Sequence, residues 1–204
     1  FIPVSPGTKF VSIGGAIGND VHGKNHHRSG TFGCHVTKLE LLRSDGRITC
    51  SPSENAKLFQ ATIGGLGLTG IITWAEIQLT KIPGMFIDVE SIKFNDLDEF
   101  LRLSKESDTT HDYTVAWLDT SRKKAKTIRE PIATLPIKMP DWFISTPLIR
   151  AFNISYYNKQ LAKKKKITTH YEPFFYPLDI LQNWNNLYGS RGLQSFQCVV
   201  PNEN

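Results

Sequence analysis

Apolar and polar residues alternate with the period of a β-strand in several stretches of the first half of the chain. Residues 36–42 alternate as a half-buried strand does, and residues 70–79 are rich in β-branched and aromatic side chains. Residues 44–47 (SDGR) form a hairpin turn signal, so residues 47–50 are predicted to return as the partner of the first strand. Residues 10–13 give a shorter strand-like run that ends at a glycine pair.

Helical features occur in three places. Ser53 is a suitable N-cap for a helix over residues 54–62, and Asn95 or Asp96 for a helix that runs to residue 105. A short helix is also predicted to begin within residues 15–21. The apolar faces predicted for the two longer helices consist of Leu58, Phe59 and Ile63 in the first, and Leu97, Phe100, Leu101 and Ser104 in the second.

The pattern changes after Pro83-Gly84, where the chain breaks. Further strands are predicted over residues 86–94, 113–118 and 193–200, and a helix is predicted from Pro177. Strands and helices that follow one another without regular βαβ units indicate an α+β fold. We therefore expect two domains, one over residues 1–82 and one over residues 83–204.

Two stretches of the second half have no clean period. Residues 121–149 are basic and rich in proline, and we expect an irregular connection there. Residues 163–166 (KKKK) are predicted to be a charge run within a loop. Such a run is typical of a solvated surface, with contact to an anionic membrane or to a phosphate-bearing substrate as the functional alternative.

The composition describes an ordinary globular chain and narrows its functions only modestly. It has 204 residues, a net charge of +5 and 40% hydrophobic residues. No run approaches the roughly 20 apolar residues that span a bilayer, and the odd number of cysteines favours reduced thiols. The basic residues are not interleaved with aromatic residues as in nucleic-acid-binding modules, so we expect no nucleic-acid partner. The lack of a signal peptide favours a cytoplasmic location, and the lysine run leaves contact with the inner membrane surface open.

Residue types suited to a binding site are most concentrated in residues 12–36, which hold six of the glycines and four of the six histidines. Glycine lets backbone approach a ligand closely, and His22, Lys24 and their polar neighbours follow at once. A second glycine cluster, GGLGLTG at residues 64–70, precedes the strand predicted over residues 70–79. We expect the two clusters to form two walls of one site.

Three interpretations of the histidine-rich stretch remain open at the level of the residues. A metal site is disfavoured because no HExxH or cysteine-pair spacing is present. A structural turn with satisfied histidines is the second, and a pocket for an anionic or redox-active group is the one we favour. The glycines match neither the Rossmann nor the P-loop fingerprint, and no nucleophile elbow is present.

Three segments together carry a specific resemblance to a known family. HGKNHH within residues 6–36 combines with GGLGLTGII within residues 58–79, and PFFYPLDILQNWNNLYGSRGLQSFQCVVP follows over residues 173–201. These segments resemble the vanillyl-alcohol-oxidase or PCMH superfamily, and within it the decaprenylphosphoryl-β-D-ribose 2-oxidase group. The resemblance implies the second lobe of a PCMH-type FAD-binding domain, joined to part of an antiparallel-sheet substrate domain.

Position by position, the resemblance also implies site residues. The residues that it places along FAD are Gly7, Ser12, Ile13, Gly14, Gly15, Asn19, Asp20, Val21, His22 and Ile72. The residues that it places in the substrate pocket are Lys24, Phe175, Trp184 and Gln197. His22 and Lys24 are the implied catalytic residues, which orient the substrate and stabilise a developing alkoxide, while neither is assigned as the base. No metal is implied.

The implied activity is the FAD-dependent oxidation of a CH–OH group. The substrate is expected to be a lipid-phosphate-linked pentose such as decaprenylphosphoryl ribose, oxidised at its C2 hydroxyl by hydride transfer to flavin N5. A related sugar-alcohol or aldonolactone oxidase, and a non-catalytic binding module on the same scaffold, are the alternatives. The resemblance further implies an NAD(P)-dependent reductase partner. Because family members extend beyond both ends of this sequence, we expect a fragment that by itself binds FAD weakly or not at all.

Overall fold

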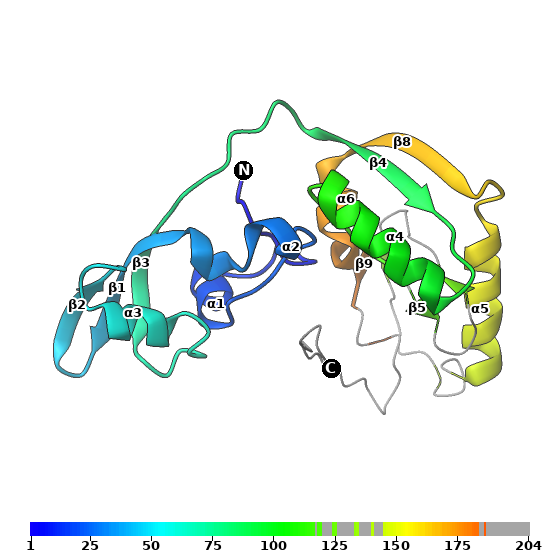
Figure 1. The fold of residues 1–204 in the computed structure, drawn as a ribbon. Helices are drawn as coiled ribbons and strands as arrows, with labels where there is room; N and C mark the ends of the chain where they lie inside the picture. The colour runs from blue at the N-terminus through cyan, green and yellow to red at the C-terminus, as the bar shows by residue number, and fades with distance from the viewer. Residues whose placement is uncertain are drawn as a thin grey trace.

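The computed structural model describes residues 1–116, 118–119, 124–125, 133–134, 140, 145–183 and 186. Helices and antiparallel sheets coexist, which confirms the α+β class. Figure 1 shows two groups of elements, one from the first 80 residues and one from the second half, linked by an extended segment after β3 (Ile71–Ile77). The domain boundary expected after residue 82 falls in that segment, and the division into domains stays a prediction.

The first group is built on a three-stranded antiparallel sheet in the order β2-β1-β3. The strands β1 (Val36–Arg43) and β2 (Gly46–Cys50) form the hairpin that the sequence predicts, and β3 pairs with the other edge of β1. Leu39 and Leu41 of β1 are fully buried, whereas the residues beside them are more exposed, as the alternating pattern requires. These strand predictions are confirmed.

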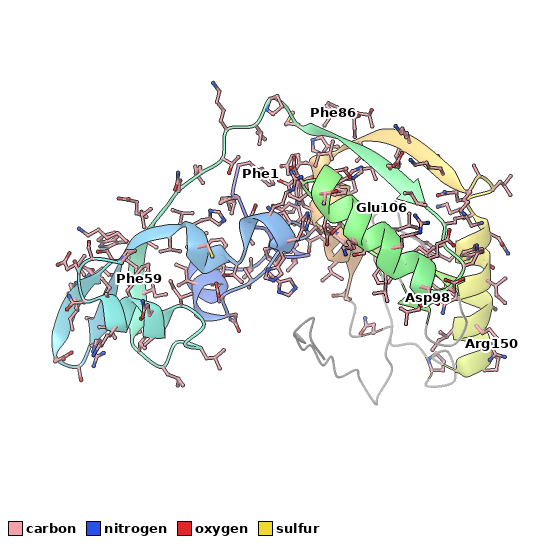
Figure 2. All side chains as sticks on the ribbon, in the orientation of Figure 1. Phe1, Phe59, Phe86, Asp98, Glu106 and Arg150 are labelled. Atoms are coloured by element: carbon pink, nitrogen blue, oxygen red, sulfur yellow. The ribbon has the colours of Figure 1, made fainter. Side chains whose placement is uncertain are left out.

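Short helices accompany this sheet. They are α1 (Ile13–Gly18), α2 (His26–Ser29), the 3₁₀ turn η1 (Phe32–His35) and α3 (Ala56–Thr62). All of them except α2 contribute buried side chains to its core. The buried apolar side chains of this core are Val4, Ala16, Ile17, Phe32, Val36, Leu39, Leu41, Cys50 and Phe59. Figure 2 shows Phe59 on α3, close to the strands.

Two local predictions in this group are wrong. Residues 10–13 form no strand, because the Ser12 side chain accepts a hydrogen bond from the Gly15 N–H and caps a helix that already begins at Ile13. The expected bend at residues 14–15 therefore lies inside α1. The helix α3 begins at Ala56, later than the residue after Ser53, because Asn55 adopts left-handed backbone dihedrals (φ 51°) at its N-terminus.

The second group combines a two-stranded antiparallel sheet with helices. Its strands are β4 (Phe86–Ile92) and β8 (Lys164–His170), which pair along their whole length. Its helices are α4 (Leu97–Thr110), α5 (Thr146–Asn158), α6 (Tyr171–Phe175) and the 3₁₀ turn η3 (Pro177–Ile180). Two-residue strands complete it: β5 (Leu118–Asp119), β6 (Lys124–Ala125), β7 (Ala133–Thr134) and β9 (Leu181–Gln182).

The lysine run at residues 163–166 is not a loop, because three of its four residues lie in β8. The carboxylate of Glu90 on β4 lies 2.9 Å from the Lys164 ammonium and 3.6 Å from that of Lys166, and Glu99 pairs with Lys163 at 2.8 Å. The hydrogen bond from Lys164 is the main cause that lowers the pKa of Glu90. Cross-strand ion pairing explains how this polar segment forms a strand.

Other predictions for the second half are corrected as well. Leu97 and Leu101 are 59% and 56% exposed, so the packed side of α4 is the one with the half-buried Phe100 and Ser104, and the Phe100 ring lies 5.3 Å from that of Phe94. Residues 113–116 form no strand, and α5 replaces part of the irregular connection. Where a helix was predicted from Pro177, residues 177–180 form a 3₁₀ turn that leads into β9, and the strand predicted over residues 193–200 lies outside the described residues.

Within the described part of the chain, no helix has both the length and the apolarity needed to cross a bilayer. In the same part, the free thiol of Cys34 is exposed and that of Cys50 is buried. Cys198 lies outside the described residues.

The start of α4 gives a first testable prediction. The Asp96 side chain accepts from the Glu99 N–H at 2.8 Å and so caps the helix, and the Glu99 carboxylate accepts from the N–H of the preceding residue, Asn95, at 2.9 Å. Replacing Asp96 with alanine is expected to lower the free energy of unfolding by about 1 kcal/mol. Urea denaturation measures the change, with Asp98→Ala in the same helical turn as the control; equal effects of both would contradict the capping role.

Candidate functional site

The two glycine clusters lie against each other at the C-terminal end of α1. The Gly64 N–H donates to the Ile17 carbonyl at 3.0 Å, and the Leu66 N–H donates to the Gly18 carbonyl at 2.8 Å. At the N-terminal end of α1, a Cβ atom added to Gly14 would meet no atom within 4 Å. Gly14 therefore presents bare backbone to open space, which a ligand can approach closely.

After α1 the chain turns sharply, and hydrogen bonds from polar side chains and the backbone stabilise that turn. Asn19 donates through Nδ2 to the Gly15 carbonyl at 2.9 Å. Asp20 has a left-handed backbone (φ 44°), and its carboxylate accepts from the Gly33 N–H at 2.8 Å. The Val21 N–H returns to the carbonyl of Ala16 at 3.1 Å. These contacts hold the backbone that leads into the histidine-rich stretch.

His22 is exposed and forms an isolated antiparallel bridge with Thr31. Its ring lies edge-on to that of His26, with 6.0 Å between their centroids. The side chain of Asn25 is buried and donates to the Pro3 carbonyl at 2.8 Å and to the Ser29 hydroxyl at 2.9 Å. The stretch thus combines a buried anchor with imidazoles on its surface.

Lys24 points across to the second group of elements. Its ammonium donates to the Phe175 carbonyl at 3.1 Å and lies 5.7 Å from the centroid of the Phe174 ring. Burial lowers the pKa of Lys24 to about 8. No carboxylate of the described residues forms an ion pair with this ammonium.

Aromatic rings form the surroundings of this ammonium. The Phe175 side chain is 4% exposed and packs at 5.0 Å from the rings of both Phe1 and Tyr113. Tyr113 also meets the Phe174 ring edge-on at 5.9 Å. Figure 2 shows Phe1 between the two groups of elements. Phe175 therefore offers its backbone carbonyl to Lys24, while its ring belongs to a buried cluster.

The N-terminal segment is fixed to α6 and η3 by polar contacts. The Gly7 carbonyl accepts from the Leu178 N–H at 3.3 Å, and the Thr8 hydroxyl donates to Asp179 at 2.5 Å. Lys9 pairs with Glu172 at 2.8 Å. Gly7 thus lies at the junction between the two groups.

The structure brings some of the predicted site residues together and leaves others apart. Lys24 and Phe175 are in direct contact, and Ser12, Gly15 and Asn19 are joined by hydrogen bonds around α1. Ile13 is 42% exposed beside Gly14, whereas Ile72 pairs with Leu41 across the sheet and packs against the core. The predicted substrate residues Trp184 and Gln197 lie outside the described residues.

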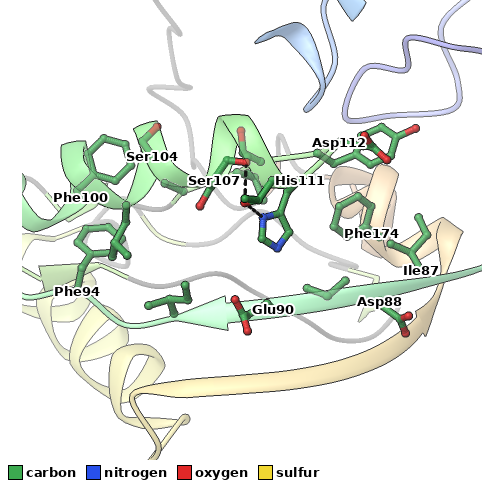
Figure 3. Close-up of a pocket in the computed structure, with 18 of the residues that line it drawn as sticks. Ile87, Asp88, Glu90, Phe94, Phe100, Ser104, Ser107, His111, Asp112 and Phe174 are labelled. Carbon is green, nitrogen blue, oxygen red and sulfur yellow. Dashed lines mark hydrogen bonds between the residues drawn. The ribbon is translucent and has the colours of Figure 1, made fainter. Parts of the chain in front are cut away.

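A cavity of about 580 Å³ lies between β4 and α4 (Figure 3). Apolar side chains such as Phe94 and Phe100 line it together with His111. Gly14, His22, Lys24 and Ile72 are not among its lining residues, so it is not the pocket that the sequence predicts. Phe174 lines the cavity and also faces Lys24, and Thr114 lines it and donates its N–H to the Lys24 carbonyl, so the two regions adjoin.

Sequence reasoning placed Phe175 beside Lys24 but missed the other residues around it, Tyr113 and Phe174. Tyr113 was predicted in a strand, and Phe174 was noted only as part of an aromatic stretch. The doubled phenylalanine was the available signal, whereas nothing local marks the hydrogen bond from the Thr114 N–H to the Lys24 carbonyl, which joins residues 90 positions apart. Among the described residues, no group of three or more His, Cys, Asp or Glu side chains is arranged to hold a metal ion.

Comparison with known proteins indicates the family of this chain. No protein-family profile matches the chain. The chain is 33% identical, over its whole length, to half of decaprenylphosphoryl-beta-D-ribose oxidase of Mycolicibacterium smegmatis. It is 40% identical, over 63% of its length, to 35% of an uncharacterized protein in the mprA 5' region of Streptomyces coelicolor. It is also 32% identical, over 55% of its length, to 22% of cytokinin dehydrogenase 9 of rice, Oryza sativa subsp. japonica.

The chain spans half of the oxidase and smaller shares of the other two relatives. Two of these relatives are named as enzymes that oxidise or dehydrogenate their substrates. The α+β architecture with its glycine-rich first group is compatible with part of a flavin-binding domain. The sequence identity over the whole chain and the α+β fold agree with the resemblance carried by the motif HGKNHH, and the chain belongs to the FAD-binding PCMH-type superfamily.

Proposed function

We propose that the protein is an FAD-dependent oxidoreductase that oxidises a secondary alcohol, the C2 hydroxyl of a lipid-phosphate-linked pentose. The observation that carries this proposal is the ammonium of Lys24, held among aromatic rings without an acidic partner in the described part of the chain. A cation so placed attracts an electron-rich oxygen of a bound substrate. The relative named decaprenylphosphoryl-beta-D-ribose oxidase supports the substrate class.

One structural observation supports the binding of a flavin cofactor by the residues present. Gly14 leaves open space where a side chain would otherwise stand, and the apolar side chain of its neighbour Ile13 is 42% exposed. Bare backbone beside an exposed apolar side chain suits a planar ring system. Gly14, Gly15 and Ile13 are the residues that we propose hold FAD, which supplies hydride acceptance when it is bound.

The chain's own residues bind and orient the substrate in this proposal. Lys24 stabilises the negative charge that develops on the substrate oxygen as the hydroxyl loses its proton. The Phe174 ring under the ammonium excludes water from that side and offers an apolar face. His22, exposed beside His26, orients the substrate from the solvent side. The base that accepts the hydroxyl proton is left unassigned.

Substrate trials separate this proposal from a sugar-alcohol oxidase. The protein is expressed from its whole reading frame, and flavin absorbance is followed without oxygen. We expect loss of the oxidised-flavin absorbance with a polyprenyl-phosphate-linked ribose and none with simple polyols. In a parallel assay with oxygen present, peroxide release on polyols would instead favour the sugar-alcohol oxidase, and the absence of bound flavin would favour a non-catalytic module.

Replacing Gly14 with alanine tests the cofactor surface directly. The added methyl group meets no protein atom and lies in a helix, so protein stability is expected to hold or to rise by about 0.5 kcal/mol. FAD affinity is expected to fall at least about tenfold, because the methyl group occupies space proposed for the ring. Titration of the apoprotein with FAD measures this, with Gly84→Ala, another open glycine position, as the control. Unchanged FAD affinity would remove Gly14 from the cofactor site.

A further inference from the structure

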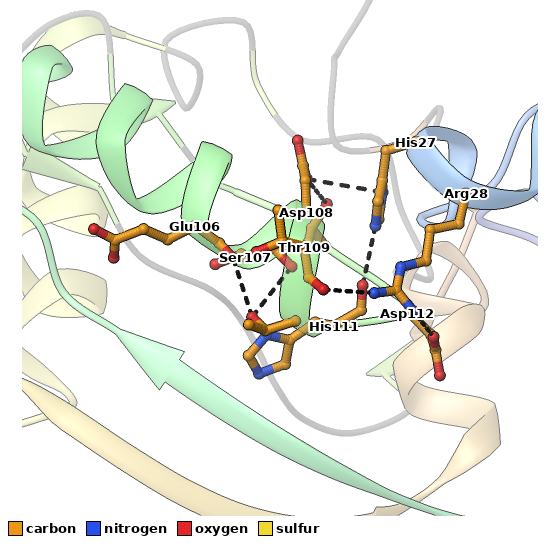
Figure 4. Close-up of polar contacts among 10 residues, drawn as sticks. His27, Arg28, Glu106, Ser107, Asp108, Thr109, His111 and Asp112 are labelled. Atoms are coloured by element: carbon orange, nitrogen blue, oxygen red, sulfur yellow. Dashed lines mark hydrogen bonds and ion pairs between the residues drawn. The ribbon is translucent and has the colours of Figure 1, made fainter.

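A set of polar contacts joins α2 to the C-terminal end of α4, across the two groups of elements (Figure 4). The Arg28 guanidinium donates through Nη1 to Asp112 at 2.6 Å and through Nη2 to the Thr109 carbonyl at 2.8 Å. Beside it, Nε2 of His27 lies 3.0 Å from the His111 carbonyl, and Nδ1 lies 3.8 Å from the Asp108 carboxylate. The partners are separated by more than 80 residues in sequence.

The acceptors are of the kind that a helix end offers. The last carbonyls of an α-helix have no partner within the helix, and its C-terminal end attracts positive charge. Thr109 lies in the last turn of α4 and His111 is its C-cap. The forked guanidinium satisfies a carbonyl and a carboxylate at once, which an ammonium cannot do with the same geometry. Arg28 is thus matched to this end of α4.

The segment held by Arg28 continues directly to Lys24. The Thr114 N–H donates to the Lys24 carbonyl at 2.8 Å, so residues 108–114 contact both ends of the stretch from Lys24 to Arg28. Between these contacts, the Tyr113 ring packs on Phe174 and Phe175. Those two residues also contact the Lys24 ammonium. Release of the segment would therefore uncover the aromatic surroundings of Lys24.

We propose that Arg28, assisted by His27, is a positioning residue that latches residues 108–114 over Lys24 and keeps its ammonium among the aromatic rings. The latch acts through Tyr113 and not by contact with substrate or cofactor. Its meaning for catalysis rests on the proposed function, whereas its effect on Lys24 is independent of flavin and substrate. Burial is the cause that lowers the pKa of Lys24, so the titration of that amine reports whether the latch is closed.

The experiment is a titration of Lys24 by NMR after reductive ¹³C-methylation of the purified protein, with Lys24→Gln to assign the signal. In Arg28→Ala the pKa of Lys24 is expected to rise from about 8 by about one unit or more, toward its ordinary value. The control is Arg102→Ala, which breaks an exposed pair with Glu106 at 2.7 Å on the same helix. It is expected to leave the titration unchanged.

Asp112→Asn separates the latch from a direct effect of charge. Removal of a nearby carboxylate alone lowers the pKa of a lysine, whereas partial opening of the latch raises it. We expect a rise, smaller than in Arg28→Ala because the bond to Thr109 remains. A charge exchange, Arg28→Asp with Asp112→Arg, is expected to restore part of the original value. An unchanged or lowered Lys24 pKa in both single variants would overturn the proposal.

The folding of each variant and the proposed function are tested by measurements separate from the Lys24 titration. Circular dichroism shows whether each variant is folded, and Arg28→Lys serves if Arg28→Ala is not, because it keeps the charge and loses the fork. The Lys24 pKa is expected to rise in that variant too. If Lys24 responds as expected while the protein oxidises no alcohol, the latch stands and the proposed function fails. The reverse outcome leaves the function and removes the latch.

Discussion

Replacing Lys24 with methionine is expected to lower kcat/KM for alcohol oxidation by about 100-fold or more. Methionine fills a similar volume among the aromatic rings but provides no charge for the developing alkoxide, and loss of one such group typically costs about 10²–10³ in rate. FAD binding is expected to persist, because the proposed cofactor surface lies on α1. Stopped-flow measurement of flavin absorbance with and without oxygen provides the rate. A variant that keeps its wild-type rate would remove Lys24 from the catalytic site.

The same residue sets the expected pH dependence. Since burial lowers the pKa of Lys24 to about 8, the amine is charged below that pH and neutral above it. An ammonium that stabilises negative charge makes the rate fall as the pH rises through about 8, and the Lys24→Met variant is expected to lack this decline. Stability changes in the opposite direction. The unfolded chain holds this proton up to its ordinary pKa of 10.5, so the cost of burying the charge is relieved between pH 8 and 10.5 and stability rises there.

Replacing Gly65 with alanine is expected to lower the free energy of unfolding by about 3 kcal/mol or to prevent folding of the first group of elements. An added Cβ would overlap the Ala61 carbonyl oxygen and lie 3.2 Å from the carbonyl carbon. Both atoms are backbone at the end of α3 and cannot turn away as a side chain does. Urea denaturation followed by tryptophan fluorescence measures the loss.

Gly14→Ala and Gly84→Ala are the matched controls for that change. Both glycines have open space where the methyl group would stand, so their stability is expected to change by less than about 1 kcal/mol. If Gly65→Ala were as stable as these variants, the close approach between residues 61 and 65 would not be a property of the folded protein in solution.

Local sequence patterns predicted the elements whose stability is decided nearby. The hairpin of β1 and β2 follows from alternation on both sides of a two-residue turn at residues 44–45, and α4 begins where Asp96 was expected to cap it. The motif HGKNHH and the glycine cluster at residues 64–70 identified the superfamily. In each case the deciding interactions lie within a few residues of one another, so the sequence carries them directly.

Predictions failed where a distant partner decides the outcome. The lysines of β8 form a strand because Glu90, more than 70 residues earlier, lies opposite them. Leu97 and Leu101 are exposed because the face of α4 that meets the sheet is the one with Phe100. Periodicity gives the existence of a helix or strand, but the side that becomes buried depends on what packs there.

The sequence by itself determined the α+β class, the first sheet and the superfamily, because alternation, turn residues and motif spacing are local properties. The tertiary structure alone decided the surroundings of Lys24. Its lowered pKa arises from burial by Phe174 and Phe175, and the segment over it is held by contacts between Arg28 and the end of α4. This burial and these hydrogen bonds exist only once distant segments meet: Arg28 and Asp112 are 84 positions apart, and Lys24 and Phe175 are 151 apart.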